Sequence, residues 1–391
     1  MQKTKKFSWP SFSRIEAQLV SNVLRSNRVN YLFGDRGKEF EDQFSKEIGV
    51  KYSLALANGT LAIDIALRAM RIKPNDEVLV TSRSFIATAS SISLLGAIPV
   101  WCDVDLNSQN ISIDEIKHKI TKKTKGIICV HFAGFPCDMF EIMKFAKSKK
   151  LFVIEDCAQA HGAKIGGKSV GSFGHISTWS FCNDKIMSLG GEGGMISTDS
   201  SNLYKFCESF NNHGKNFTKI KSLPKNIKTF PYIHDSIGSN YRMTEMQSAL
   251  GIYQLKQLND WNKLRNRNAQ IFINEIKDLA IAKFPLIPKD YSHAWYKLYI
   301  TLQPNQIKKE HSRDSIIKKL NANGVDSGFG GCGEIYKEKA FTKIKQGNKR
   351  LKNAKFLEDN SIMILIHPTL PKKEVFKRAK VLKKVLTDSQ R

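Results

Sequence analysis

Lys185 is the residue of this 391-residue chain whose surroundings point most directly to chemistry. It follows the short apolar run 179–182 and precedes the glycine-rich run 190–194. A lysine held in a partly desolvated pocket can present a neutral amine, which condenses with an aldehyde to give a Schiff base. Because most lysines are solvated, this pattern alone is more typical of an exposed loop. Other positions along the chain must therefore support the chemical interpretation.

A carboxylate follows a predicted strand upstream of this lysine. Residues 151–154 are apolar and partly β-branched, which predicts a buried parallel strand that ends at Glu155 and Asp156. Ligands of open α/β sheets bind beyond the carboxyl ends of the strands. Asp156 is thus placed to keep a pyridinium nitrogen protonated, which makes such a ring an electron sink. The alternative is an aspartate that caps the amino end of a helix.

A glycine-containing turn at residues 57–60 leads into a helical pattern at residues 61–67. The first N–H groups of a helix and its dipole favour an anion, so Gly59 and Thr60 are candidates for binding a phosphate. The turn matches neither the Walker loop nor the dinucleotide fingerprint, so no nucleoside triphosphate or dinucleotide site is expected. A helix start without a ligand remains the alternative.

These three features occur in the order that pyridoxal phosphate enzymes use, and the chain resembles the DegT/DnrJ/StrS family of sugar aminotransferases. The resemblance implies the type I fold of transferases that depend on pyridoxal 5'-phosphate (PLP). This is an α/β fold with a mostly parallel central sheet and a smaller C-terminal α+β domain. The large PLP-binding domain is expected at residues 1–255 and the small domain at 256–391. The stretches that carry the resemblance are residues 58–60, 84–89, 155–162, 179–185, 191–194 and 238–243.

The resemblance implies a role for each residue that contacts the cofactor ring. Lys185 would bind pyridoxal 5'-phosphate covalently and later move a proton, and both roles need an amine beside the cofactor. Relatives that remove a hydroxyl carry histidine there, so the lysine implies a transaminase. Asp156 would pair with the pyridinium nitrogen, and Gln159 would donate a hydrogen bond to the ring hydroxyl oxygen. Phe85 would stack on the ring face, with core packing as the alternative.

The resemblance also implies a phosphate site that two subunits share. Gly59 and Thr60 would hold the phosphate through N–H groups and a hydroxyl, and Ser180 would add a second hydroxyl. Asn240 would reach the same phosphate from the second subunit of a homodimer with shared active sites.

Four further residues are assigned by weaker arguments. His213 and Arg242 are candidates for contacting the substrate, although Arg242 has a structural ion pair as its alternative. His161 is interpreted as a core or supporting histidine, and His367 as structural.

Strand-like and helical patterns alternate along the chain, which favours a mostly parallel sheet. Strands are expected at residues 50–56, 77–81, 98–101, 126–130 and 151–155, with helices at 85–95 and 138–149. Two more strands, at 176–181 and 194–198, flank the lysine loop. A long helix at 244–277 leads to the small domain, where a strand at 297–301 and helices at 312–322 and 372–386 are expected. Residues 214–236 lack strong periodicity and are expected to form a mobile excursion near the site.

Composition bears on the compartment in which the protein is expected to act. No run of 18 apolar residues occurs, so no membrane insertion is expected, and no apolar segment follows the basic N-terminus, so no signal peptide is expected. The seven cysteines form no CxxC pair and no metal-binding spacing with histidine, so no metal site is expected. They are expected to be free thiols of a cytoplasmic protein. Those in strand-like contexts, expected to be buried, are Cys102, Cys129, Cys157 and Cys182.

The net charge of +26 has three interpretations. It is either a solvated lysine-rich surface, a field that attracts a nucleotide-diphosphate substrate, or a surface for nucleic acid or an anionic membrane. No helix-turn-helix, zinc-finger or RNA-recognition signature accompanies the charge, which weakens the third interpretation.

The leading hypothesis is therefore an aminotransferase that moves an amino group from an amino acid, with L-glutamate expected, to a nucleotide-linked keto-deoxysugar for surface-glycan or amino-sugar biosynthesis. Amination of a cyclitol or of a keto-sugar without a nucleotide is the alternative, and a nucleic-acid-binding regulator on the same scaffold is the remote one. Ile186 stands where many relatives have asparagine, which leaves the sugar preference open. The glycine-rich stretch 327–333 is expected near the substrate pocket.

Overall fold

The computed structural model describes residues 7–224, 230–344 and 350–391. Its centre is a seven-stranded sheet, parallel from β8 (Ile176–Ser180) to β3 (Ile98–Cys102), in which β9 (Gly194–Thr198) runs antiparallel to both of its neighbours. The mostly parallel sheet predicted from the sequence is thus confirmed. In spatial order the strands are β1 (Tyr52–Leu56), β9 (Gly194–Thr198), β8 (Ile176–Ser180), β5 (Phe152–Asp156), β4 (Thr124–Val130), β2 (Glu77–Thr81) and β3 (Ile98–Cys102).

Helices cover both faces of this sheet. Successive strand residues face opposite sides, so along β1 Leu54 and Leu56 pack in one core while Ala55 packs in another. The first core contains α3 (Gly59–Ala69) and the second contains α2 (Arg36–Ile48). Both faces of the strands are therefore apolar, as expected for a buried parallel sheet. The other helices of this part are α1 (Arg14–Arg25), α4 (Ala87–Leu94), α5 (Ile113–Lys119), α6 (Met139–Lys149) and α7 (Ser201–Phe210).

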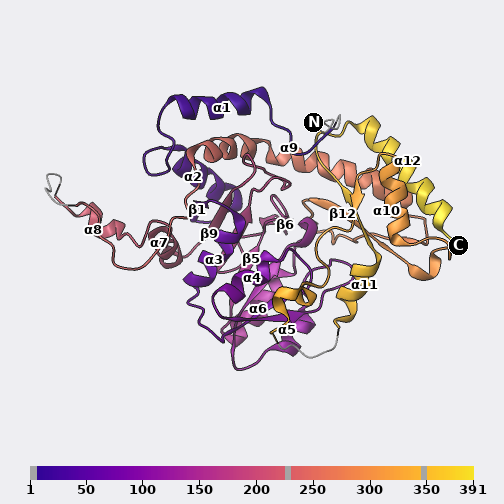
Figure 1. The fold of residues 1–391 in the computed structure, drawn as a ribbon, viewed down its shortest axis with the longest axis horizontal. Coiled ribbons are helices and arrows are strands. Elements are labelled where there is room, and N and C mark those ends of the chain that lie inside the picture. The colour runs from indigo at the N-terminus through magenta and orange to yellow at the C-terminus, as the bar shows by residue number, and fades with distance from the viewer. Residues whose placement is uncertain (1–6, 225–229, 345–349) are drawn as a thin grey trace.

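Helix α9 (Glu245–Ile276) joins the large part of the molecule to the small one, and Figure 1 shows it running along one edge of both. It begins with a capping box formed by Thr244 and Gln247. Its first half packs in the core of the large part through Leu255, and its second half packs in the core of the small part through Phe272. The domain boundary predicted at residue 255 falls inside this helix and stays a prediction.

The small part contains a four-stranded antiparallel sheet packed against α9, α10 (Arg313–Ala322) and α12 (Lys372–Ser389). Its strands, in spatial order, are β10 (Ala282–Lys283), β12 (Lys297–Leu302), β14 (Ser361–Leu365) and β13 (Ser327–Gly328). A separate three-stranded sheet is formed by β11 (Tyr291–Ser292), β6 (Lys164–Ile165) and β7 (Lys168–Ser169). Helix α11 (Lys352–Asn360) precedes β14.

A projection carries the short helix α8 (Phe217–Lys221) away from the body of the molecule, as Figure 1 shows at its left edge. It belongs to the excursion predicted at residues 214–236, of which residues 225–229 lie outside the described residues. The mobility of this excursion stays a prediction. Among the helices of the described ranges, none combines the length and the apolar character that crossing a bilayer requires.

Candidate active site

A cavity of about 620 Å³ lies at the carboxyl ends of β5 and β8, where the start of β12 approaches the large part. Its position agrees with the expectation for an open α/β sheet. It brings together the residues predicted for the cofactor within one subunit. These are Gly59, Thr60, Phe85, Asp156, Gln159, Ser180 and Lys185.

One end of the cavity is the start of α3. The side chain of Asn58 caps the helix by accepting a 3.0 Å hydrogen bond from the N–H of Leu61. A Cβ on Gly59 would lie 2.6 Å from Cβ of Ser180, so only glycine lets the helix start approach the end of β8 this closely. The first-turn N–H groups have no acceptor within the helix, and two hydroxyls, of Thr60 and Ser180, lie beside them. This arrangement fits a phosphate.

Asp156 supplies a buried carboxylate at the end of β5. Its Oδ2 accepts a 2.9 Å hydrogen bond from the Thr88 hydroxyl, and its Oδ1 accepts one of 3.1 Å from the N–H of Ala158. Burial raises the pKa of Asp156, while these two bonds and the charge of Lys185 act in the opposite direction. No helix begins at this residue, so the helix-cap alternative does not hold. A cationic ring nitrogen would stabilise the ionised form of this buried acid.

Phe85 and Gln159, which are predicted to contact the cofactor ring, both line the cavity. The Phe85 side chain is 63% exposed although it lines the cavity, so the core-packing alternative does not hold. The Gln159 Oε1 atom accepts a 2.8 Å hydrogen bond from the N–H of Ala133. The amide NH₂ of Gln159 therefore stays available as a donor, as binding to a ring hydroxyl oxygen requires.

The Lys185 amine is mostly buried and has two polar neighbours. Its Nζ lies 3.7 Å from Oδ1 of Asp184 and 3.5 Å from the hydroxyl of Tyr296, at the start of β12. The indole N–H of Trp9 donates a 2.7 Å hydrogen bond to the backbone oxygen of Lys185, which helps to fix the loop. The lysine is therefore held inside the cavity, and the exposed-loop alternative does not hold.

Asp184 joins the lysine loop to the small part of the molecule. It accepts hydrogen bonds from the Tyr296 hydroxyl and from Nζ of Lys297, the latter at 3.0 Å. Burial acts to raise the pKa of Asp184, but the charges of Lys185 and Lys297 outweigh it and hold this pKa well below its usual range. Asp184 is therefore an anion that these cations surround.

The cavity also has polar residues that were not predicted from the sequence, among them Thr88, Asp184, Tyr296 and Lys297. Thr88 and Asp184 lie within stretches that carry the family resemblance, and that is the signal by which they could have been found. Tyr296 and Lys297 come from another part of the fold and have no comparable signal. One prediction was wrong: Cys182 is only half-buried, because it lines the opening of this cavity.

The three remaining predicted residues do not line this cavity. His213, Asn240 and Arg242 gather around residues 211–212 instead, where Asn212 forms an isolated bridge with Asn240 and accepts a 3.2 Å hydrogen bond from Arg242. Within the described ranges Arg242 has no carboxylate partner. Asn240 is expected to act in the site of a second subunit, which the structure of one subunit does not test. Its role therefore stays a prediction, and the roles of His213 and Arg242 stay predictions too.

His161 and the glycine-rich stretch lie where the sequence interpretation puts them, and the structural role of His367 stays a prediction. His161 packs against the rings of Trp179 and Phe181, and burial lowers its pKa to about 3, so it is neutral near pH 7. Its contacts are those of a supporting core residue. Gly330 and Gly331, from the stretch 327–333, line the cavity.

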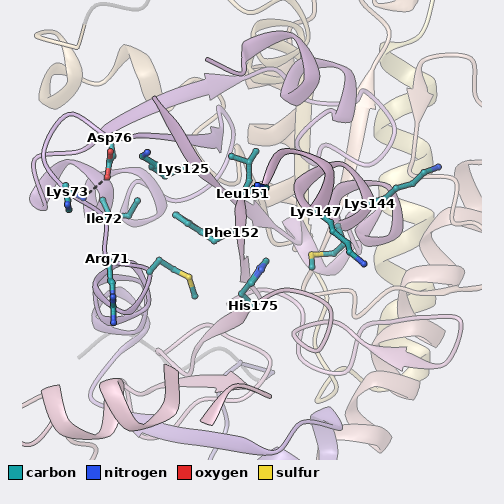
Figure 2. Close-up of a pocket in the computed structure, with 13 residues that line it drawn as sticks. Arg71, Ile72, Lys73, Asp76, Lys125, Lys144, Lys147, Leu151, Phe152 and His175 are labelled. Atoms are coloured by element: carbon teal, nitrogen blue, oxygen red, sulfur yellow. Dashed lines mark hydrogen bonds between the residues drawn. The ribbon is translucent and has the colours of Figure 1, made fainter. Parts of the chain in front are cut away.

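A second hollow, of about 1100 Å³, lies at the opposite ends of the strands, where β2, β4, β5 and β8 begin (Figure 2). Its side chains come from the segment between α3 and β2, from the beginnings of β4 and β5 and from α6, including Arg71, Lys125, Lys147 and Phe152. Because ligands of open α/β sheets bind at the carboxyl ends of the strands, this hollow is not the candidate active site.

Comparison with known proteins gives a consistent result. The sequence profile of the DegT/DnrJ/EryC1/StrS aminotransferase family matches residues 11–384. A GDP-perosamine synthase of Escherichia coli O157:H7 is 37% identical over 79% of this chain and 82% of that protein. A UDP-N-acetyl-3-dehydro-alpha-D-glucosamine 3-aminotransferase of Acidithiobacillus ferrooxidans is 33% identical over 92% of this chain and 90% of that protein. The X-ray structure of an aminotransferase from Psychrobacter cryohalolentis superimposes with a TM-score of 0.95 at 44% identity, covering 98% of this chain and 99% of that one.

The match spans nearly the whole chain, and the fold is that of known PLP-dependent aminotransferases, so the resemblance and the fold class predicted from the sequence are confirmed. The family implies PLP as the cofactor, and the cavity has a phosphate-binding end, a buried acid and a lysine amine that fit it. The chain belongs to the DegT/DnrJ/EryC1/StrS aminotransferase family and is a PLP-dependent transaminase.

Proposed function

We propose that this transaminase moves an amino group from L-glutamate to the keto group of a nucleotide-linked deoxysugar, in the cytoplasm, for the biosynthesis of a surface glycan. The observation that carries the proposal is Lys185, whose amine shares one cavity with Asp156. The names of the GDP- and UDP-sugar relatives support the substrate class. The positive net charge supports it further, because a positive field raises the association rate of an anionic diphosphate.

Each side chain of the cavity has its own role in the proposed reaction. Bound PLP supplies an electron sink that stabilises negative charge developing at the α-carbon of the amino acid. The amine of Lys185 would hold the cofactor and, when free, would accept the proton from that α-carbon. Asp156 keeps positive charge on the ring nitrogen, and the amide of Gln159 donates to the ring hydroxyl oxygen. Thr60 and Ser180 anchor the phosphate, and the mostly buried position of Lys185 limits the access of water to the proton transfer.

The first experiment tests the role of Lys185. The purified protein with added PLP is expected to be yellow, and borohydride is expected to fix the cofactor on Lys185, as read by peptide mass. Lys185→Ala should keep the thermal stability of the wild type and lose both the adduct and all turnover. A colourless wild-type protein after PLP addition, or full turnover by Lys185→Ala, would contradict the proposal.

The second experiment tests the nucleotide. Thermal unfolding is measured with GDP-, UDP- and dTDP-linked sugars, using Lys185→Ala as a variant that binds without turnover. One nucleotide class is expected to raise the melting temperature, because a ligand that binds only the native state stabilises it. If none of the three does, the substrate lacks a nucleotide, and a free keto-sugar or cyclitol becomes the preferred class.

The proposal includes a homodimer in which each subunit completes the other's phosphate site through Asn240. The location of Asn240 outside the cavity of its own subunit supports this arrangement. The exposed Phe230 and Ile237 on the same segment also support it, because large exposed apolar side chains mark contact surfaces. The proposal requires an isologous arrangement, the most common kind for two-subunit proteins.

Mixing two inactive variants tests the shared site. Lys185→Ala and Asn240→Ala are unfolded together and refolded, so that mixed dimers contain one site with both native residues. Activity is expected to recover to about a quarter of that of the wild type, since about half of the dimers are mixed and each has one good site. Each variant refolded alone is the control, and a mixture no more active than these controls would refute shared sites.

A further inference from the structure

The hollow at the amino ends of the strands, drawn in Figure 2, gathers cations. Of its 13 lining residues, six are lysine or arginine and one, Asp76, is acidic. The six cations are Arg71, Lys73, Lys125, Lys144, Lys147 and Lys150. Lysine and arginine account for 62 of the 391 residues of the chain, so overall composition alone does not explain a lining that is nearly half cationic.

Few acids balance these cations. Asp76 accepts a 2.9 Å hydrogen bond from the backbone N–H of Lys73, and Nζ of Lys144 lies 3.6 Å from a carboxylate oxygen of Glu141. Within the described ranges, none of the other five cations of the lining forms an ion pair with a carboxylate. An anion that enters the hollow therefore meets a net positive charge.

Two of these cations stand at backbone positions that disfavour a side chain. Arg71 and Lys150 have φ angles of +56° and +55°, in the left-handed region, where α3 and α6 end. At both ends the N–H of the next residue, Ile72 or Leu151, donates to the carbonyl oxygen of the fifth residue before it, at 3.4 and 2.9 Å. Helices that end in this way usually have glycine at the left-handed position, because a Cβ strains that backbone. Gly49 at the end of α2 follows this rule, whereas α3 and α6 end with a cation.

The helix dipole does not account for these two cations. A positive side chain near the carboxyl end of a helix is favourable, but helical residues of the last turn provide it without strain. Arg68 does so in α3, and Lys149 does so in α6. Strained backbone positions cluster at sites that bind or react. The strain at Arg71 and Lys150 therefore favours a role in binding an anion.

An apolar floor lies between the cations. Figure 2 shows Phe152 near the middle of the hollow, with Arg71 on one side and Lys147 on the other. The ring of Phe152 lies across Gly126 of β4, where a Cβ would be 2.2 Å from a ring carbon. The floor is formed by Met70, Ile72, Met143, Leu151 and Phe152. All five are buried or half-buried, so they offer a contact surface inside the hollow and do not project from it.

This combination selects the class of ligand. Several cations around an apolar floor fit a ligand that carries several negative charges on a flat, largely apolar group. A nucleoside diphosphate is such a ligand, because its base can cover an aromatic ring while its phosphate oxygens accept hydrogen bonds from lysine and arginine. A bare phosphate leaves the floor uncovered, and a bilayer needs apolar side chains that project from the surface. The volume of about 1100 Å³ is large for a small-molecule site and accommodates a whole nucleotide.

We propose that this hollow is a second, non-catalytic site, which binds a nucleoside diphosphate. Arg71 and Lys150 bind its phosphates from two helix ends, and Phe152 contacts its base. The site goes beyond the proposed function, because it lies at the other ends of the strands that carry the candidate active site. Strand β5, for example, begins at Phe152 in the hollow and ends at Asp156 in the cavity of Lys185.

Replacing the two strained cations by glycine tests the site without weakening the fold. Arg71→Gly/Lys150→Gly removes both charges and relieves both left-handed positions, so the melting temperature of this double variant should not fall below that of the wild type. Lys149→Gln is the control for charge, because Lys149 is next to Lys150 and does not line the hollow. Asn75→Gly is the control for the backbone, because Asn75 has a φ angle of +69° and also lies outside the lining.

Binding of ADP, GDP, UDP and inorganic pyrophosphate to the PLP-loaded protein is measured by calorimetry. At least one nucleoside diphosphate should bind to the wild type and to both controls. Its binding to the double variant should be weaker by about tenfold or more, the size expected for losing charge-assisted contacts. Phe152→Leu should weaken binding of this diphosphate and leave that of pyrophosphate unchanged. In the wild type the diphosphate should protect residues 70–73 and 143–152 from hydrogen exchange, which locates the site.

The outcomes separate this site from the candidate active site. If the cavity of Lys185 binds the same diphosphate, the wild type shows two binding events and the double variant shows one, which supports the proposal. In the double variant, stabilisation by a nucleotide-sugar reports the cavity of Lys185 alone, so a failure of the second site is distinguishable from a failure of the proposed substrate.

Three results would overturn the proposal. The first is wild-type binding by the double variant, or no binding of any of the three diphosphates. The second is pyrophosphate binding as tight as that of the diphosphates, which would exclude a base contact. The third is binding of vesicles of equal parts phosphatidylglycerol and phosphatidylcholine, lost in the double variant, by a protein that binds no diphosphate. This last result would assign the hollow to an anionic membrane surface.

Discussion

The hydroxyl of Thr88, on α4, donates a 2.9 Å hydrogen bond to Oδ2 of Asp156 at the end of β5. This contact fixes the acid that we propose to face the cofactor ring, and it stabilises the charged form of that acid. A hydrogen bond to an ionised group contributes about 1.5–3 kcal/mol. Thr88→Val, which keeps the shape and removes the donor, should therefore weaken PLP binding roughly ten- to hundredfold. Thr88→Ser keeps the hydroxyl and should stay near the wild type in a fluorescence titration with PLP, and equal affinities of the two variants would contradict this role.

The pH dependence of PLP binding should report the same carboxylate. Burial raises the pKa of Asp156 above the ordinary value of 3.8. As the pH falls, the carboxylate of Asp156 therefore binds a proton at a higher pH in the native state without cofactor than in the unfolded chain. Ionising Asp156 therefore costs stability as the pH rises from 3.8 through the raised pKa. A cationic ring nitrogen needs the ionised acid, so PLP binding should weaken as the pH falls through that pKa. Titrations of the wild type and Asp156→Asn across the acidic range check this, and an identical pH profile for Asp156→Asn would refute it.

The sequence alone predicted the positions of those cavity residues that lie where one helix or strand pattern ends and the next begins. Asp156 follows a continuous apolar run, Gly59 opens a helical pattern, and Lys185 lies between a strand pattern and a glycine run. Each of these positions is set by local periodicity, which a single sequence displays. The order of the three along the chain then led to the family resemblance, and the resemblance supplied the roles.

The opposite wall of the site depends on tertiary packing and was not predicted. Tyr296 reaches Asp184 across 112 residues of sequence, because α9 places the small sheet against the lysine loop. The alternation of a strand pattern does not show which of its residues faces another domain. Arg265 is a similar case: its helix was predicted, but its burial depends on Trp9 packing over it. Such contacts between distant segments leave no periodic signal in the sequence.

The contact between Gly59 and Ser180 predicts a specific steric defect. A Cβ at position 59 would lie 2.6 Å from Cβ of Ser180, so Gly59→Ala must push the start of α3 away from β8. Overpacking of this kind typically costs about 1–3 kcal/mol, which should lower the melting temperature of the cofactor-free protein. Ser180→Gly removes the nearest atom, so the double variant should recover part of the loss. Additive effects of the two substitutions in thermal unfolding would contradict a direct clash.

The difference in burial among the seven cysteines predicts a labelling pattern that reports on the cavity. Cys182 and Cys332 are partly accessible, whereas the other five are buried. Burial raises the pKa of Cys332 to about 11, which leaves little reactive thiolate near pH 7. Cys182 lines the cavity proposed for PLP and should therefore be the first to react with an aromatic disulfide reagent in the native protein. Bound PLP should slow this reaction, with Cys182→Ser as the control that loses the fast phase. Fast labelling of the buried cysteines, or a Cys182 rate that PLP does not change, would show that the opening of the cavity differs from the one described.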